Sequence, residues 1–221
     1  MCARTLETLQ RHEAEFGRDR SLAVAMDIRD QTSVDAGVRR IVERFGRIDV
    51  VVNNAGISGV TPIDASDSAA WLNIMNTNIL GTYYVTRSAV PRMPNGGRIV
   101  MMSSVLGKFG VPGYTAYCTA KTGLIGFTRA LALELAPRKI TVNALCPGWV
   151  DTEMALMGMK NGAAVQGITL EDFRKQALSR VPLGEMGTPD EVANLVVFLA
   201  SDAGRNITAQ AISICGGSTQ A

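Results

Sequence analysis

The chain has 221 residues, of which 47% are hydrophobic and 19% charged, and its 22 basic and 20 acidic side chains leave a net charge of +2. This composition predicts one compact domain with a buried core and excludes an intrinsically disordered chain. The near balance of charges gives no reason to expect a nucleic acid or an anionic membrane as partner, and no apolar run is long enough to cross a bilayer.

Cysteine and histidine are too few and too scattered to predict a metal site. The only histidine is His12, which lies in a polar stretch, and no two cysteines have the C-x-x-C spacing of zinc or redox sites. We therefore expect no bound metal. The four cysteines are expected to be reduced thiols in a cytoplasmic protein. They are Cys2, Cys118, Cys146 and Cys215.

The first third of the chain alternates between strand and helix patterns. Ser21–Asp27 and Asp49–Ala55 are short apolar runs that predict strands. The second run lacks the alternation of a strand with one solvated face, so we expect it to be buried on both faces. Between the two runs, Ser33–Phe45 carries apolar residues at helical spacing, namely Val34, Val38, Ile41 and Val42.

The middle of the chain continues this alternation. Asp67–Val90 is expected to be one helix that ends before Pro91, because proline cannot continue a helix. After it, Arg98–Ser104 predicts a strand. Thr115–Ala136 predicts a long helix, and Lys139–Cys146 predicts a further strand.

The last third begins with a segment of different character. Met154–Gly167 is rich in glycine and methionine with weak periodicity, so we expect a mobile loop or lid beside the site. Pro189–Ala200 predicts a helix and Ala211–Cys215 the last strand. The repeated β-α order predicts an α/β fold with a doubly wound, mostly parallel, Rossmann-like sheet, and residues 1–221 form a single domain.

Tyr117 and Lys121 stand four residues apart in the predicted long helix, so their side chains share one face. A phenol is a weak acid, with a reference pKa of about 10, and a nearby ammonium stabilises its ionised form. Such a pair can serve as general acid or general base. The spacing alone is weak evidence, because many helices contain it by chance.

The stretch from Arg98 to Ala136 resembles the active-site segment of the short-chain dehydrogenase/reductase family. In that family a serine ends a strand and a Y-x-x-x-K motif opens the next helix; here Ser104 precedes Tyr117 by the family's 13 positions. The resemblance implies that Ser104 hydrogen-bonds the substrate carbonyl oxygen and Tyr117 supplies the proton. It implies that Lys121 lowers the pKa of Tyr117 and binds the nicotinamide ribose.

Further motifs of this family follow in the family's order. Asn78 matches an asparagine that holds a relay water linked to the lysine, and Asp27, with Ile28 beside it, matches the adenine contact. Residues 53–56 (NNAG) match the segment near the adenosine ribose, and residues 147–152 (PGWVDT) match the one that orients the nicotinamide. The resemblance assigns cofactor binding to Arg4, Asp27, Ile28, Asn54, Ala55, Gly56, Tyr117, Lys121, Pro147, Gly148, Val150 and Thr152.

The start of the chain departs from the family pattern. Family members begin with a strand and a T-G-x-x-x-G-x-G turn that receives the cofactor pyrophosphate, and this sequence has no such motif. Met1–Arg4 resembles the end of the family's second strand. We expect either a longer natural protein or a truncated product that binds dinucleotide weakly. Arg4 stands where a basic residue often meets the 2′-phosphate of NADP, which favours NADP while leaving NAD open.

The C-terminal half is similar to bacterial 3-oxoacyl-[acyl-carrier-protein] reductases and polyketide ketoreductases, through segments such as VNALCPGWVDTEMA and RVPLGEMGTPDEVANLVVFL. This resemblance implies hydride transfer between NADP(H) and a ketone or secondary alcohol, with a 3-oxoacyl thioester or a cyclic ketone as substrate. Residues 153–188 would form the substrate lid. The alternatives are an NAD-dependent alcohol dehydrogenase and a catalytically silent subunit that pairs with a full-length relative. A homotetramer or homodimer is expected.

Overall fold

The computed structural model describes residues 1–17, 19–64 and 66–220. Its strands are β1 (Cys2–Ala3), β2 (Val24–Ala25), β3 (Val50–Asn53), β4 (Arg98–Met102), β5 (Thr141–Pro147) and β6 (Ala211–Ile214). Its α-helices are α1 (Leu6–Phe16), α2 (Gln31–Phe45), α3 (Ala69–Met75), α4 (Thr82–Ala89), α5 (Thr115–Leu135), α6 (Glu153–Gln166), α7 (Leu170–Ser179) and α8 (Pro189–Ala200). Helices α1 and α7 lie where the sequence patterns had predicted no element.

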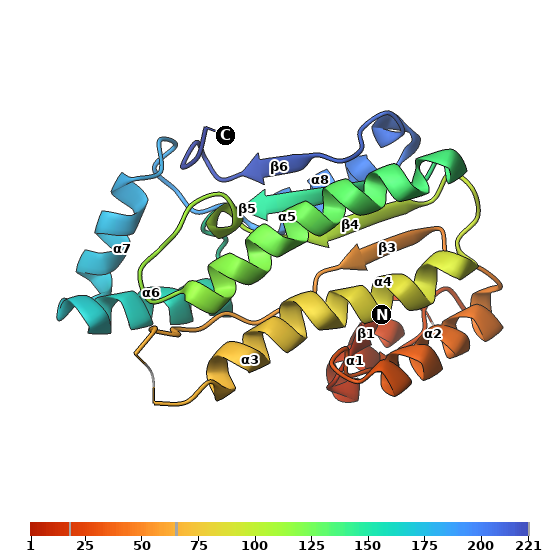
Figure 1. Ribbon diagram of the computed structural model, residues 1–221, viewed down its shortest axis with the longest axis horizontal. Helices are drawn as coiled ribbons and strands as arrows, with labels where there is room; N and C mark the ends of the chain where they lie inside the picture. The colour runs from red at the N-terminus through yellow and green to blue at the C-terminus, as the bar shows by residue number, and fades with distance from the viewer. Residues whose placement is uncertain (18, 65, 221) are drawn as a thin grey trace.

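The strands form two parallel sheets. The first pairs β1 with β2, and the second has the order β3-β4-β5-β6. Helices lie on both sides of the larger sheet, with α4 and α5 in front and α8 behind, and its strands all point towards α6 and α7 (Figure 1). This arrangement confirms the predicted α/β, Rossmann-like fold class with a parallel sheet.

The core consists of two layers that sandwich the larger sheet. On one face Ile99 and Met101 of β4 pack with Leu131 and Leu135 of α5. On the other face Val100 packs with Leu145 and with Leu199 of α8. Strand β4 is therefore buried on both faces, as parallel strands between helices are.

The expectation that residues 49–55 form a strand buried on both faces is wrong. Strand β3 spans only Val50–Asn53, and burial alternates along it: Val51 is 7% exposed, whereas Val50 and Val52 are 40% and 42% exposed. Val51 faces the core and Asn53 bonds to Thr86 of α4, so only one face of β3 is covered. The apolar run reflects strand propensity rather than two-sided burial.

The predicted helix over Asp67–Val90 is interrupted. Helices α3 and α4 are joined by a π-helical segment, Asn76–Gly81, whose wider turn holds the buried Asn78. After α4 the chain passes into a short 3₁₀ turn, Val90–Arg92, that includes Pro91. Such π segments occur often at functional sites, because the extra residue re-aims neighbouring side chains.

The segment Met154–Gly167 is not the mobile loop that its composition predicted; it is helix α6. Thr152 caps the first turn by accepting from the backbone N–H of Ala155 at 3.3 Å. Two glycines weaken the helical pattern in the sequence, and packing requires one of them, Gly162. A Cβ at Gly158 would lie 3.5 Å from the ring of Trp149, and one at Gly162 would overlap the ring of Phe173 on α7.

No helix in the described part of the chain is both long and apolar enough to span a membrane.

Candidate active site

Ser104, Tyr117 and Lys121 come together at the carboxyl end of β4. Ser104 lies just beyond the strand and is 8% exposed, while Tyr117 and Lys121 lie in the first two turns of α5. The Ser104 hydroxyl oxygen accepts from the backbone N–H of Leu106 at 3.1 Å. Its own proton therefore stays available to another acceptor.

The Tyr117 phenol is set up to keep its proton. Burial raises the pKa of Tyr117 above its ordinary value of 10.0, and a hydrogen bond with Ser104 opposes that rise only in part. That Lys121 lowers this pKa stays a prediction. The Lys121 ammonium lies over the Tyr117 ring, 5.4 Å from its centroid.

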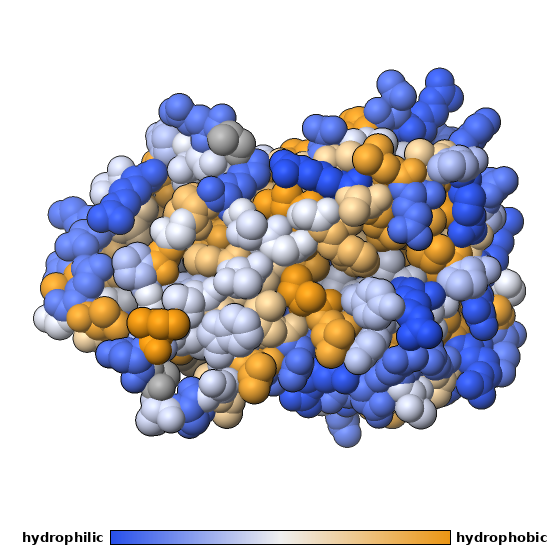
Figure 2. Space-filling view, in the orientation of Figure 1, coloured by the Kyte–Doolittle hydropathy of each residue, from blue (hydrophilic) through white to orange (hydrophobic). Residues whose placement is uncertain are grey.

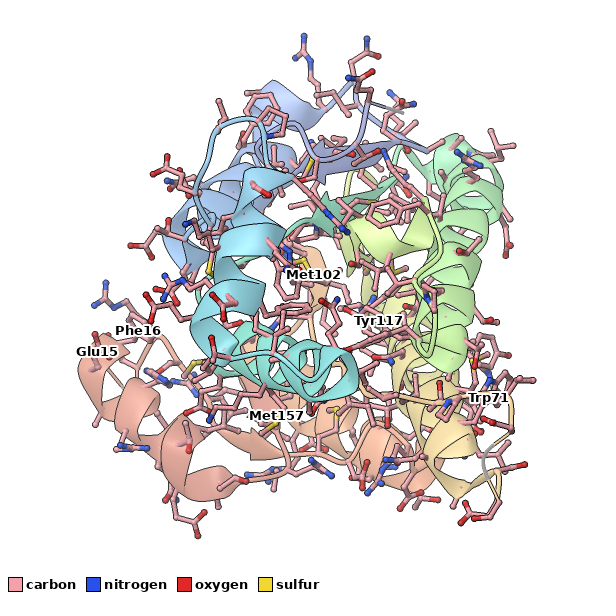
Figure 3. The ribbon with its side chains drawn as sticks, turned by 90° about the vertical axis from the view of Figure 1, so that its left-hand side faces the viewer. Glu15, Phe16, Trp71, Met102, Tyr117 and Met157 are labelled. Atoms are coloured by element: carbon pink, nitrogen blue, oxygen red, sulfur yellow. The ribbon has the colours of Figure 1, made fainter. Side chains whose placement is uncertain are left out.

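Lys121 is a buried cation with a single backbone acceptor among the described residues. Its side chain is 4% exposed, and its Nζ donates to the carbonyl oxygen of Met102 at 2.7 Å. Burial lowers the pKa of Lys121 to about 8, because desolvation penalises the ammonium. Figure 3 shows Met102 and Tyr117 near each other, behind the helix α6 that carries Met157.

Ser103 positions helix α5 rather than the reacting groups. Its hydroxyl donates to the carbonyl oxygen of Lys121 at 2.8 Å, which joins the end of β4 to α5. A Cβ at Gly107 would lie 2.8 Å from that same Lys121 oxygen and 2.9 Å from the Ser103 hydroxyl. As expected from the alternation of strand side chains, Ser103 and Ser104 face different partners.

The Asn78 side chain bonds both backbone groups of Ile57, in the loop after β3; we call this pair of hydrogen bonds the clasp. Its side-chain oxygen accepts from the backbone N–H of Ile57 at 3.0 Å, and its side-chain nitrogen donates to the Ile57 carbonyl at 2.8 Å. The side-chain amide of Asn78 is therefore used by Ile57. A relay water at this position would bind the backbone of Asn78 instead. Gly56 lies against this clasp, because a Cβ there would come within 2.6 Å of the Asn78 oxygen.

We predict that Gly56→Ala disrupts the clasp. The added methyl would meet the Asn78 oxygen at 2.6 Å and come within 3.5 Å of the Lys121 ammonium, so one of these groups must move. Overpacking of this kind costs about 1–3 kcal/mol. Urea unfolding and the cofactor KM measure the effect. Gly59→Ala is the matched control, since its Cβ would lie 3.6 Å from Ile74, an ordinary contact; equal losses in both variants would contradict the clasp.

The other residues expected to contact the cofactor lie at or just beyond the carboxyl ends of β3 and β5. Asn54 and Ala55 are exposed just after β3. Gly148 follows β5, and a Cβ there would lie 2.9 Å from Cys215 after β6, so the close approach requires glycine. Of the remaining residues, Pro147 ends β5, and Val150 and Thr152 lie between β5 and α6.

The expected adenine contact, Asp27, lies just beyond β2. The Arg29 guanidinium holds the pKa of Asp27 at about 2, through hydrogen bonds first and charge second, with a smaller contribution from the charge of Arg4. Arg4 is exposed, and Ile28 packs against the backbone of Gly81. Arg29 was not predicted from the sequence; its place two residues after Asp27 was the available signal.

Comparison with known proteins places this geometry in a family. Residues 2–219 match a family model described as enoyl-(acyl carrier protein) reductase. The 3-oxoacyl-[acyl-carrier-protein] reductase FabG of Thermotoga maritima is 40% identical over 194 residues, which cover 87% of this chain and 74% of that protein. A Streptomyces virginiae protein named as a ketoacyl reductase of the monensin polyketide synthase is 42% identical over 196 residues, 87% of this chain and 75% of its own length.

The chain belongs to the short-chain dehydrogenase/reductase family. As a member of this family it is an NAD(P)-dependent oxidoreductase. Two solved structures share its fold closely. A variant of actinorhodin polyketide ketoreductase, solved with NADPH, has a TM-score of 0.90 and 37% identity and covers 98% of this chain and 85% of its own. Sorbitol-6-phosphate 2-dehydrogenase from Erwinia amylovora has a TM-score of 0.91 and 30% identity, with 97% and 86% covered.

The residues present fit two parts of the family's dinucleotide. An ammonium has three donors, and Lys121 uses one of them on Met102, which leaves donors for the hydroxyls of a ribose. Asp27 and Ile28 offer a polar and an apolar contact to an adenine. Within the described ranges we find no Gly-rich turn leading into a helix that would receive the pyrophosphate.

Proposed function

We propose that this chain is an NADPH-dependent reductase of a ketone, with a 3-oxoacyl thioester or a cyclic ketone as substrate. The observation that carries the proposal is that Ser104, just beyond the carboxyl end of β4, meets Tyr117 and Lys121 in the first turns of α5. The names of two relatives, a 3-oxoacyl reductase and a polyketide ketoreductase, support this substrate class.

Each side chain has a part that follows from its surroundings. When bound, the reduced nicotinamide supplies the hydride to the carbonyl carbon. The Ser104 hydroxyl donates to the carbonyl oxygen, where negative charge grows. Tyr117 then gives its proton to that oxygen, and its raised pKa means that the proton is present at neutral pH. Lys121 binds the ribose hydroxyls, and Asn78 orders the loop beside it.

We propose the following cofactor contacts from the family motifs. Arg4 meets the 2′-phosphate of NADP, and Asp27 and Ile28 contact adenine. NAD remains the alternative cofactor, in which case the enzyme would run as an alcohol dehydrogenase. Asn54, Ala55 and Gly56 lie near the adenosine ribose. The nicotinamide and its ribose meet Tyr117, Lys121, Pro147, Gly148, Val150 and Thr152.

We propose that residues 153–188 form the substrate lid of this single domain. Helix α6 in this region presents apolar side chains to solvent: Met154 is 47% exposed, Met157 57% and Val165 76%. Methionines adapt to ligands of varied shape, so these side chains suit an apolar substrate.

The test is oxidation of NADPH and of NADH with a panel of 3-oxoacyl thioesters and cyclic ketones. Turnover with NADPH and a member of either substrate class is the expected result. Turnover with NADH alone would favour the NAD-dependent dehydrogenase. A folded chain that turns over no member of the panel with either cofactor would contradict the proposal and favour a silent subunit.

We also propose a cytoplasmic homotetramer or homodimer. Apolar side chains are spread across the face formed by α3, α4 and α5 (Figure 2), where Leu72, Tyr83 and Leu133 are 50%, 42% and 73% exposed. An apolar patch of this kind marks a protein interface. All four cysteines are free thiols, which suits a reducing compartment. A monomer mass by light scattering at micromolar concentration would contradict the assembly.

A further inference from the structure

The turn after β2 is stabilised by a surface ion pair in which Arg29 donates several hydrogen bonds to Asp27. The Arg29 guanidinium donates to both carboxylate oxygens of Asp27, from Nε at 3.0 and 3.2 Å and from Nη2 at 2.7 Å. The backbone N–H of Arg29 also donates to Asp27, at 3.0 Å. A bidentate, charge-assisted pair of this geometry is stronger and more directional than a single surface ion pair.

The same guanidinium reaches a different element of the fold. Its Nη1 donates to the side-chain oxygen of Asn73 on α3 at 3.2 Å, across 44 positions of sequence. Between Asp27 and Arg29, the side chain of Ile28 packs on Gly81 so closely that a Cβ there would meet it at 2.7 Å. The turn is therefore fixed to α3 at one point and to the end of the π segment at another.

The element that receives these contacts, α3 with its π segment, also contacts the loop beside Lys121. Asn78 lies in the same π segment, between the Asn73 and Gly81 contacts, and its side chain clasps Ile57 in the loop beside Lys121. One continuous element, α3 with its π segment, thus touches the loops at both ends of the proposed cofactor site.

We propose that Arg29 is a positioning residue for the nucleotide end of the cofactor site, where it fixes Asp27 and ties the turn after β2 to α3. This inference rests on the proposed function. A turn held in its binding geometry loses less conformational freedom when the nucleotide binds. Arg29 also balances the charge of Asp27, which would otherwise repel the anionic cofactor.

The test compares Arg29→Ala with Arg47→Ala. Arg47 forms the matched control, because it also pairs with an aspartate two residues later, Asp49, at 3.1 Å, but both side chains are more than half exposed and lie before β3, at the far end of the strands. The first readout is hydrogen–deuterium exchange of residues 27–32 in the free protein. The second is the affinity for adenosine 5′-monophosphate, which needs no turnover.

We expect Arg29→Ala to speed exchange in residues 27–32 and to weaken binding of the nucleotide by about tenfold, the scale of a lost charge-assisted contact. Asn73→Ala, which removes only the far partner, should show a smaller change of the same kind. Arg29→Lys should restore charge but only part of the protection, since an ammonium cannot form the bidentate pair. With NADPH, the KM should rise while kcat stays unchanged.

Three results would overturn the inference: exchange and affinity unchanged in Arg29→Ala, equal changes in Arg47→Ala, or no binding of the nucleotide to the natural chain. The proposed reductase activity fails separately. If no ketone is turned over, but Arg29→Ala alone loses nucleotide affinity and protection, the positioning role of Arg29 stands without the reaction.

Discussion

Replacing Tyr117 by phenylalanine is expected to lower kcat for ketone reduction by about 10²–10⁴-fold, the usual contribution of a general acid. The variant loses only the hydroxyl, so the ring remains packed in the site under the Lys121 ammonium. Because burial raises the pKa of Tyr117, the phenol carries its proton throughout the neutral range, and no titration of this group should lower kcat there. Initial rates of NADPH oxidation under saturating ketone measure the effect.

The matched control is Tyr114→Phe. Tyr114 lies three residues earlier, before the first turn of α5, and burial also raises its pKa. It lacks a lysine four positions later, where Cys118 stands. We expect its removal to leave kcat nearly unchanged. Comparable losses in the two variants would show that the phenol of Tyr117 has no special part, and a retained rate in Tyr117→Phe would require another proton donor.

Lys121→Met is expected to abolish reduction and to change how stability depends on pH. The pKa of Lys121 is about 8 in the folded chain, against an ordinary value of 10.5. Folding therefore disfavours the charged form of Lys121. The resulting cost in folding free energy is largest below about pH 8, declines as the pH rises, and vanishes above pH 10.5. The two pKa values correspond to about 3 kcal/mol of unfolding free energy. The methionine variant carries no such penalty.

Urea unfolding of both proteins between pH 7 and pH 10.5 tests this expectation. The stability of the natural chain should rise relative to Lys121→Met by about 3 kcal/mol over that interval. Loss of the hydrogen bond to Met102 shifts the stability of the variant by a similar amount at every pH, so it does not produce this slope. Lys160→Met, at an exposed position on α6, controls for the general effect of removing one positive charge. Parallel curves for all three proteins would contradict a buried, destabilised ammonium.

The sequence predicted those parts of the fold in which one pattern dominates. Residues 189–200 form helix α8 over the range expected, because Pro189 and the capping box of Thr188 and Glu191 fix its start. The strand β4 and the helix α5 also lie where the apolar runs placed them. Ser104, Tyr117 and Lys121, the proposed catalytic residues, were predicted from the family resemblance and its spacing of 13 and then four residues, and the end of β4 and the start of α5 bring them together.

Tertiary contacts explain what the sequence could not reveal. The pattern of helix α6 looked irregular partly because of Gly162. The ring of Phe173 on α7 requires a glycine there, and no local sequence rule identifies such a partner. The pKa of Tyr117 depends on its burial first and on a hydrogen bond with Ser104, and neither follows from residue spacing. Arg29 was missed because its second partner, Asn73, is 44 residues away.

The division of the sheet has a consequence for the behaviour of the chain in solution. Within the described residues, β3 pairs with β4 on one side and with no strand on the other. Its sequence, Val50–Asn53, carries no lysine, proline or bulge of the kind that blunts an open strand. The backbone N–H and C=O groups on this open edge can pair with a strand from another molecule. The exposed side chains of Val50 and Val52 lie beside that edge. We therefore expect β3 to favour strand-to-strand association between molecules, independently of any assembly through the helices.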